Sequence, residues 1–325
     1  MFNTPVLFLI FNRLDTTQQV FEAMRKVKPR YFYIAADGPR LAKENEDQVC
    51  DEVRSYVLSN IDWDCEIKTL FRNENLGCGK AVSEAINWFF ENVEEGIILE
   101  DDCMPDDSFF KFCSVMLDRY RNDTRLMHIG GTNFQFGNIT EDGDYYYSVI
   151  PHVWGWATWR RAWNLYKFNL KEVKSISEKK YKMAFNNVQP FIHHFKEIFS
   201  VMKKSGIDTW DYQWFYALIF NNGLAVIPNN NLIKNIGFRE DGTHTLEERE
   251  WNILNIAKQM NSFRAPLGKK SNPDADAYTL REIVGIRPES VMNKNYAKNT
   301  LKKIFFRLNK LFKNKKPAPD KDQKF

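Results

Sequence analysis

Short apolar runs alternate with longer amphipathic stretches over the first 130 residues, and this alternation constrains the fold most. The run PVLFLIF at 5–11 is continuously apolar, as expected for a strand buried on both faces. Further strands are expected at 31–36, 66–71, 96–99 and 125–129. Strands separated by helical patterns predict an α/β fold with a mostly parallel sheet and helices on both faces.

The helical patterns fall between those strands. The first is expected to begin at Thr16 or Thr17, either of which can cap it, and to end before Pro29. The next three cover 41–58, 81–93 and 106–121. The second half is less regular and contains a Trp-rich segment at 153–163, helices to about 204, a helix at 208–220 and a strand at 224–228.

Composition excludes several classes of protein. Aromatic residues make up 15% of the 325 residues, which rules out disorder over most of the length. No apolar run approaches the roughly 20 residues that a membrane-spanning helix needs, and the N-terminal run lacks the features of a signal peptide. The five cysteines are odd in number and form no C-x-x-C pair, so we expect neither a disulfide framework nor a zinc site. These features predict a cytoplasmic protein.

The net charge of +4 conceals a segregation of charge along the chain. From Lys298 onward ten basic and two acidic residues carry +8, so residues 1–297 carry −4. A basic field for binding nucleic acid is therefore not expected. Apolar residues between Leu301 and Phe312 recur at three- and four-residue spacing among lysines, which predicts a basic amphipathic helix. Such a tail can lie on the inner face of an anionic membrane, or dock on the body or on another subunit.

Three consecutive acids, Glu100, Asp101 and Asp102, follow directly after an apolar strand pattern. Neighbouring carboxylates raise one another's pKa unless a cation lies among them. Mn²⁺ or Mg²⁺ prefers carboxylate oxygen, and such ions take one or two protein ligands and complete their shell with phosphates and water. The cluster therefore predicts a metal–diphosphate site, and the alternative is a solvated loop or helix cap.

Polar residues follow three other predicted strands as well. Asn12 and Arg13 follow the first, Asp37 and Gly38 the second, and Arg72 and Asn73 the third. The carboxyl ends of parallel strands meet at one edge of a sheet, where ligands of such folds bind. We therefore expect these residues and the three acids to surround a common ligand.

Several segments, taken in order, resemble the GT-A (nucleotide-diphospho-sugar transferase) fold glycosyltransferases. The likeness is greatest to the N-acetylglucosaminyltransferase I type and related bacterial sugar transferases. The acidic segment GIILEDDC at 96–103 is similar to the E-D-D form of the D-x-D motif. The other similar segments are FNRLDTTQQVFEAM at 11–24, IAADG at 34–38, RNENLGCGKAVSEAINWFF at 72–90, HVWGWATWRRAW at 152–163, TWDYQW at 209–214 and NIGFREDGTHT at 235–245.

The resemblance implies a Rossmann-like mixed sheet that binds a nucleotide sugar, a uridine diphosphate donor. It implies that Asp102 binds the metal, that Asp101 and Glu100 lie near the ribose or nucleotide, and that Arg13 and Asp37 contact base and sugar. The residues themselves add further donor-binding candidates. Asn12 and Asn75 would offer polar groups, Gly77 would allow close approach of the backbone, and Lys80 would add a cation at a helix start or be merely solvated.

Transfer of a sugar to a hydroxyl with inversion needs one carboxylate as general base. Asp211 is our candidate, by resemblance to the Trp-Asp segment of the family, although Tyr212 stands where the family has a second acid. Asp208 is a second candidate. Either residue can instead cap the helix expected at 208–220.

Two further donor-binding candidates come from the second half of the chain. Gly155 and Trp156 are expected to contact the donor sugar or the acceptor, whereas Trp154, Trp159 and Trp163 fit helix core packing. His244, in a glycine-containing loop, is expected to contact the diphosphate from a lid.

The sequence thus predicts three parts: a glycosyltransferase domain at 1–265, a peripheral extension at 266–297 and the basic tail at 298–325. The predicted function is transfer of a sugar from a nucleotide diphosphate to a glycan or lipid-linked hydroxyl. Two alternatives stay open, a sugar-phosphate nucleotidyltransferase and a non-enzymatic membrane-associated binding protein. The absence of glycine just after the first strand argues against the nucleotidyltransferase.

Overall fold

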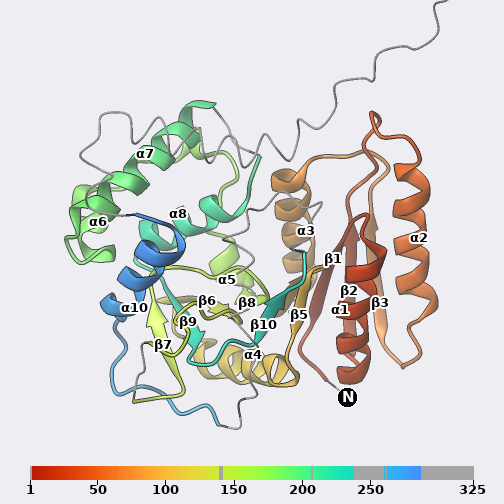
Figure 1. Cartoon of the computed structure of the whole chain (residues 1–325), viewed down its shortest axis with the longest axis horizontal. Coiled ribbons are helices and arrows are strands. Elements are labelled where there is room, and N and C mark those ends of the chain that lie inside the picture. Colours follow the sequence, from red (N-terminus) through yellow and green to blue (C-terminus); the bar gives the residue numbers. More distant parts are fainter. Residues whose placement is uncertain (1, 139–141, 206–207, 238–259, 261, 287–325) are drawn as a thin grey trace, which may run out of the picture.

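A sheet of eight strands, in the order β3-β2-β1-β4-β8-β6-β9-β7, organises the chain (Figure 1). This computed structural model describes residues 2–138, 142–205, 208–237, 260 and 262–286. The strands of the sheet are β1 Val6–Ile10, β2 Tyr31–Ala36, β3 Glu66–Phe71, β4 Glu95–Glu100, β6 Leu126–Gly130, β7 Tyr145–Ser148, β8 Trp156–Trp159 and β9 Leu224–Pro228. A second, two-stranded sheet pairs β5 Cys103–Pro105 with β10 Ile233–Asn235.

The first four strands of the sheet are parallel, with Val6 opposite Phe32 on β2 and Ile97 on β4. β8 then runs antiparallel between β4 and β6, β9 is parallel to β6, and β7 closes the sheet antiparallel to β9. The sheet is therefore mixed, and the carboxyl ends of β1 to β4 meet at one edge. The predicted α/β class, a mixed sheet with helices on both faces, is confirmed.

The alternating side chains of β1 show how the two faces are covered. Val6, Phe8 and Ile10 join a core formed with α1 Leu14–Val27, α2 Glu46–Ser59 and α4 Asp107–Tyr120. Leu7 and Leu9 point to the other face and join α3 Cys78–Asn92, α5 Arg160–Trp163 and α8 Asp211–Asn221. Each such fully buried side chain contributes about 1.5–3 kcal/mol. A third core unites α8 with α6 Glu178–Ala184, η1 Leu170–Glu172 and α7 Gln189–Ser205.

Two local predictions were wrong. The first helix begins at Leu14, with Arg13 at its N-cap position, so Thr16 and Thr17 lie buried inside the helix. The Thr17 hydroxyl donates to the Arg13 carbonyl at 2.6 Å, which satisfies the side chain within the helix. The helical spacing expected for Trp154, Trp159 and Trp163 is wrong because Trp159 belongs to strand β8, although Trp159 and Trp163 are core residues as expected.

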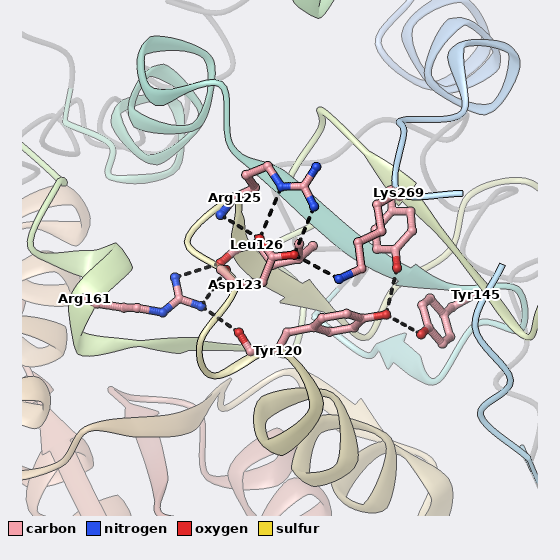
Figure 2. Close-up of polar contacts among 8 residues, drawn as sticks. Tyr120, Asp123, Arg125, Leu126, Tyr145, Arg161 and Lys269 are labelled. Atoms are coloured by element: carbon pink, nitrogen blue, oxygen red, sulfur yellow. Dashed lines mark hydrogen bonds and ion pairs between the residues drawn. The ribbon is translucent and has the colours of Figure 1, made fainter. Parts of the chain in front are cut away.

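Polar contacts secure the amino edge of the sheet, where β6 begins (Figure 2). Arg161 donates to the carbonyls that follow α4, including those of Tyr120 at 2.9 Å and Asp123 at 3.0 Å. The Asp123 carboxylate accepts from Arg125 and from Lys269, both at 3.1 Å. These contacts place Arg161 and Asp123 in a structural role, at the edge opposite the carboxyl ends of the strands.

The described part of the predicted peripheral extension packs on the body. Its α10 Pro273–Tyr278 is followed by η2 Thr279–Ile283, and Ala275 and Leu280 are fully buried. The buried Asp276 carboxylate accepts from the Ser148 hydroxyl and from the Val149 amide. The domain boundaries stay a prediction, and the basic tail lies outside the described residues. No helix within the described ranges is long and apolar enough to span a bilayer.

Candidate functional site

The acidic turn follows β4 at the carboxyl edge of the sheet. Glu100 is the last residue of β4, and Asp101 is 8% exposed. The Phe11 amide, just after β1, donates to Asp101 at 3.2 Å, which ties the ends of the two strands together. Burial, and then the charge of Asp102, raises the pKa of Glu100 and of Asp101 well above the usual carboxyl range. Ionising the whole turn is therefore unfavourable unless a cation lies beside it.

Arg13 supplies one cation to this turn. Its guanidinium pairs with the Asp102 carboxylate at 2.9 Å, and the two side chains are 44% and 19% exposed. Desolvation lowers the pKa of Arg13, but the charges of Asp101, Asp102 and Glu100 outweigh it and raise that pKa. The structure thus brings together four of the predicted site residues from two adjacent strand ends.

A loop from the second half of the chain closes over Asp102. The Ile236 amide donates to the Asp102 carbonyl at 2.8 Å, extending the β5–β10 pairing. A Cβ on Gly237 would lie 2.3 Å from a carboxylate oxygen of Asp102, so only glycine fits there without displacement. The sequence indicated a polar loop at this place, but nothing in it singled out Gly237.

The donor set fits a single divalent cation bound mainly by its ligand. The three acids lie beside a single guanidinium, that of Arg13, and a bound divalent cation would lower the cost of ionising them together. Within the described residues no group of three or more His, Cys, Asp or Glu side chains has the geometry of a metal cage. A hard ion with one protein carboxylate, completed by phosphate and water, agrees with both observations. Asp102 is the residue that would hold it.

The predicted donor-binding residues just after β2 and just before α3 contact one another. The Asp37 carboxylate accepts from the amides of Leu76 at 3.0 Å and Gly77 at 3.2 Å, and from the Asn75 side chain at 2.9 Å. Burial raises the pKa of Asp37 more than these amides lower it. In this structure Asp37 therefore organises the loop before α3.

The start of α3 is held by a residue that is distant in sequence. An Asp208 oxygen accepts from the Gly79 amide at 2.8 Å and so caps the helix. Gly77 has a φ of +82°, and a Cβ on it would lie 2.7 Å from Asp208, so the turn requires glycine. Lys80 is half-exposed and pairs with Glu84 at 3.7 Å. Asp208 therefore caps α3 and not the helix at 208–220, which has Trp210 at its N-cap position and no side-chain cap.

Asp211 begins α8 on the other side of the site. One carboxylate oxygen accepts from the Thr209 hydroxyl and from the Tyr212 amide, the latter at 2.9 Å. Burial raises the pKa of Asp211 above the ordinary value. Asp211 lies close enough to Glu100 for its charge to contribute to the raised pKa of Glu100. The structure therefore places the candidate base and the acidic turn in one electrostatic environment.

Gly155 and Trp156 lie at the start of β8, inside the sheet. Trp156 is 1% exposed and packs among Trp210, Trp214 and Trp163, so the prediction that its ring contacts a sugar is corrected: the ring is part of the core. Gly155 has a φ of +58°, and a Cβ there would meet Ile233 at 2.3 Å. His244 lies outside the described residues.

Sequence reasoning missed two residues beside the site, Arg40 and Glu46. Glu46 is 4% exposed and accepts from the Asn12 side chain at 2.9 Å and from the Arg40 backbone amide at 2.7 Å. Glu46 lies in the stretch 41–58 that was expected only to be helical, and Arg40 immediately precedes that stretch. No spacing signal marks a contact that joins the end of β1 to the start of α2.

Comparisons with known proteins found likenesses among solved structures only. No family model matches it, and no curated protein matches it. Similar solved structures include mouse xyloside xylosyltransferase 1, at 8% identity over 68% of this chain and 82% of that chain, with a TM-score of 0.35. HddC from Yersinia pseudotuberculosis is 12% identical over 49% of this chain and 77% of that chain, with a TM-score of 0.31. A 4-diphosphocytidyl-2C-methyl-D-erythritol synthase from Anaerococcus prevotii is 10% identical over 57% and 85%, with a TM-score of 0.30. Likenesses this low carry no argument about function, which must be argued from the site itself.

Proposed function

We propose that this chain is a metal-dependent inverting glycosyltransferase that uses a uridine diphosphate sugar. One observation carries the proposal: three adjacent acids, of which Asp101 is buried, lie beside Arg13, and the partly buried Asp211 of α8 is near enough to contribute to the raised pKa of Glu100. These are the two parts that glycosyl transfer needs, a place for a metal–diphosphate and a separate carboxylate base.

The donor diphosphate would bind at the carboxyl edge of β1 and β4. Asp102 would hold Mn²⁺ or Mg²⁺, which when bound stabilises negative charge on the leaving diphosphate as a Lewis acid. Arg13 lies at the same place and offers a fixed guanidinium, which matches phosphate oxygens well. Glu100 and Asp101 would face the nucleotide from the buried side of the turn.

Asp211 would act as the base. Its first oxygen is held by Thr209 and by the Tyr212 amide. Both of these bonds go to Oδ1, and Oδ2 would accept the proton of the acceptor hydroxyl. That hydroxyl oxygen forms a bond to the anomeric carbon while the carbon–oxygen bond to the diphosphate breaks, and the proton ends on Asp211. The raised pKa of Asp211 suits this role, because a general base is most effective when its pKa lies near the pH at which the enzyme acts.

The acceptor in this proposal is the hydroxyl of a glycan or a lipid-linked saccharide on the cytoplasmic face of a membrane. The composition of residues 298–325, basic and amphipathic, supports it, because such segments bind anionic surfaces. Those residues lie outside the described ranges.

A screen of nucleotide sugars by thermal shift, with and without Mn²⁺, tests the proposal, followed by analysis of the released product. We expect stabilisation by a UDP-sugar only with the metal, and release of UDP on transfer. Release of pyrophosphate from a nucleoside triphosphate would instead indicate the nucleotidyltransferase. The direct passage from β1 through Asn12 and Arg13 into α1, without glycine, disfavours that activity. Absence of any metal-dependent nucleotide binding would favour the binding-protein alternative.

A further inference from the structure

A second polar cluster, formed by Phe11, Asn12, Arg40 and Glu46, lies next to the acidic turn. Glu46 is its centre: the side chain is 4% exposed, and it accepts from the Asn12 amide at 2.9 Å. It also accepts from Arg40 through the backbone amide at 2.7 Å, through Nε at 2.8 Å and through Nη2. Desolvation raises the pKa of Glu46, but Arg40 outweighs it and the net pKa is lowered.

The ionised Glu46 fixes which atom of Asn12 is available to a ligand. A carboxylate only accepts hydrogen bonds, so the Asn12 side chain must direct its Nδ2 toward Glu46. Within the described residues no donor contacts Asn12 Oδ1. Turning the amide over would set its oxygen against a buried carboxylate, which is costly because like acceptors repel and one group is left unpaired. Asn12 is thus held as a hydrogen-bond acceptor, one residue away from Arg13.

Arg40 forms a flat surface beside that acceptor. Its guanidinium edge is bound to Glu46, and the group lies over the Phe11 ring, 5.3 Å from the ring centroid. The Arg40 side chain is still 31% exposed. A planar guanidinium that is held on one edge and one face is suited to stacking on a nucleobase.

We propose that this cluster is the nucleobase subsite, and that Glu46 is a positioning residue that makes it select uracil over cytosine. The inference rests on the proposed function, because it assumes that a nucleoside diphosphate lies along the same edge with its phosphates at Arg13 and Asp102. The base stacks on Arg40 and presents its ring edge to Asn12 Oδ1. Uracil carries an N–H at N3 and can donate a hydrogen bond to Asn12 Oδ1. In cytosine N3 is an acceptor, so two acceptors, N3 and Oδ1, would face each other without a hydrogen between them.

The ligand itself offers the first test. Calorimetry of the full chain with Mn²⁺ should show UDP binding about tenfold or more tightly than both CDP and N3-methyl-UDP, because each of these lacks the donor and leaves Asn12 unpaired. The N3-methyl compound keeps every other group of uracil, and CDP adds no bulk at N3. Binding of CDP within about twofold of UDP would overturn the inference.

Variants then test the role of Glu46. In Glu46→Gln the neutral amide can pair with either end of the Asn12 side chain, so the ratio of UDP to CDP affinity should fall toward one. Glu52→Gln, an exposed change on the same helix, should leave that ratio unchanged. Should Glu46→Gln fail to fold, Asn12→Ala, at a partly exposed position, should lose the same selectivity; an unchanged ratio there would overturn the inference.

The outcomes separate this inference from the proposed function. If wild-type protein bound UDP and CDP with equal affinity in the presence of Mn²⁺, the transferase proposal would stand. The proposed selection of uracil over cytosine would be contradicted. Wild-type protein that binds no nucleoside diphosphate would contradict the transferase proposal and remove the subsite with it.

Discussion

Asp208 and Asp211 lie three residues apart, and the structure gives them different tasks that substitutions can separate. The Asp208 carboxylate accepts from the Gly79 amide at 2.8 Å, across 129 residues of sequence, and so caps α3. Asp208→Ala removes both the acceptor and the charge, whereas Asp208→Asn keeps an acceptor oxygen and removes only the charge. Comparison of the two variants therefore separates the contribution of the hydrogen bond to stability from the contribution of the charge.

The expected magnitudes follow from the two parts of this contact. Loss of a side-chain cap costs about 0.5–2 kcal/mol, and loss of a negative charge at a helix N-terminus costs about 0.3–1 kcal/mol. Asp208→Ala should therefore lower the free energy of unfolding by about 1–2 kcal/mol and Asp208→Asn by less than about 1 kcal/mol.

Urea unfolding followed by far-UV circular dichroism measures these differences, and turnover is measured on the same preparations. Asp208→Asn should keep turnover close to that of the wild-type protein, because Asp208 is a cap and not the base. Equal unfolding free energies for all three proteins would refute the capping role. Lost turnover in a stable Asp208→Asn protein would move the base from Asp211 to Asp208.

Three further predictions concern the proposed base, the loop over Asp102 and a buried acid. Asp211→Asn should reduce turnover about 10²–10⁴-fold while UDP affinity is kept; near-normal turnover in a kinetic assay would reject Asp211 as the base. Gly237→Ala should weaken Mn²⁺-dependent UDP binding in calorimetry by displacing Asp102, whereas Gly268→Ala, where a Cβ meets nothing within 4 Å, should not; equal affinities would contradict the close approach. Burial raises the pKa of Asp276 to about 7 from 3.8, so its stabilising contribution is complete below about pH 4 and is lost as pH rises to about 7. In Asp276→Asn the thermal midpoint should no longer fall for this reason as the pH rises toward 7. If the midpoints of the wild-type and variant proteins changed with pH in parallel, the raised pKa of Asp276 would be contradicted.

The sequence predicted the half of the fold that local patterns determine. The apolar run at 5–11 and the stripes of the first helices specify strands and helices directly, and their alternation specifies a parallel arrangement. That arrangement predicted that Arg13 and Asp102 lie at the same edge of the sheet, and the structure shows the two side chains there as an ion pair. Which residues gather there can be predicted in this way because the carboxyl ends of parallel strands lie at the same edge of a sheet.

Long-range contacts were beyond such reasoning. The cap of α3 by Asp208 and the contact of Glu46 with Asn12 join segments whose separation in sequence carries no period or motif. Trp156 was assigned to a ligand because tryptophan stacks on sugars, but the strand β8 lies between β4 and β6, and the central position buries its ring. Which aromatic side chains face a ligand depends on the order of strands in the sheet, and the sequence does not state that order.

The most direct test of the account is the affinity for UDP measured by calorimetry with and without Mn²⁺, in the wild-type protein, in Asp102→Ala and in Asp107→Ala. Asp107 is an exposed acid in the first turn of α4 and serves as the matched control. We predict that Mn²⁺ increases UDP affinity in the wild-type and Asp107→Ala proteins and has no effect on the folded Asp102→Ala protein. An undiminished Mn²⁺ effect in Asp102→Ala would contradict the metal–diphosphate site.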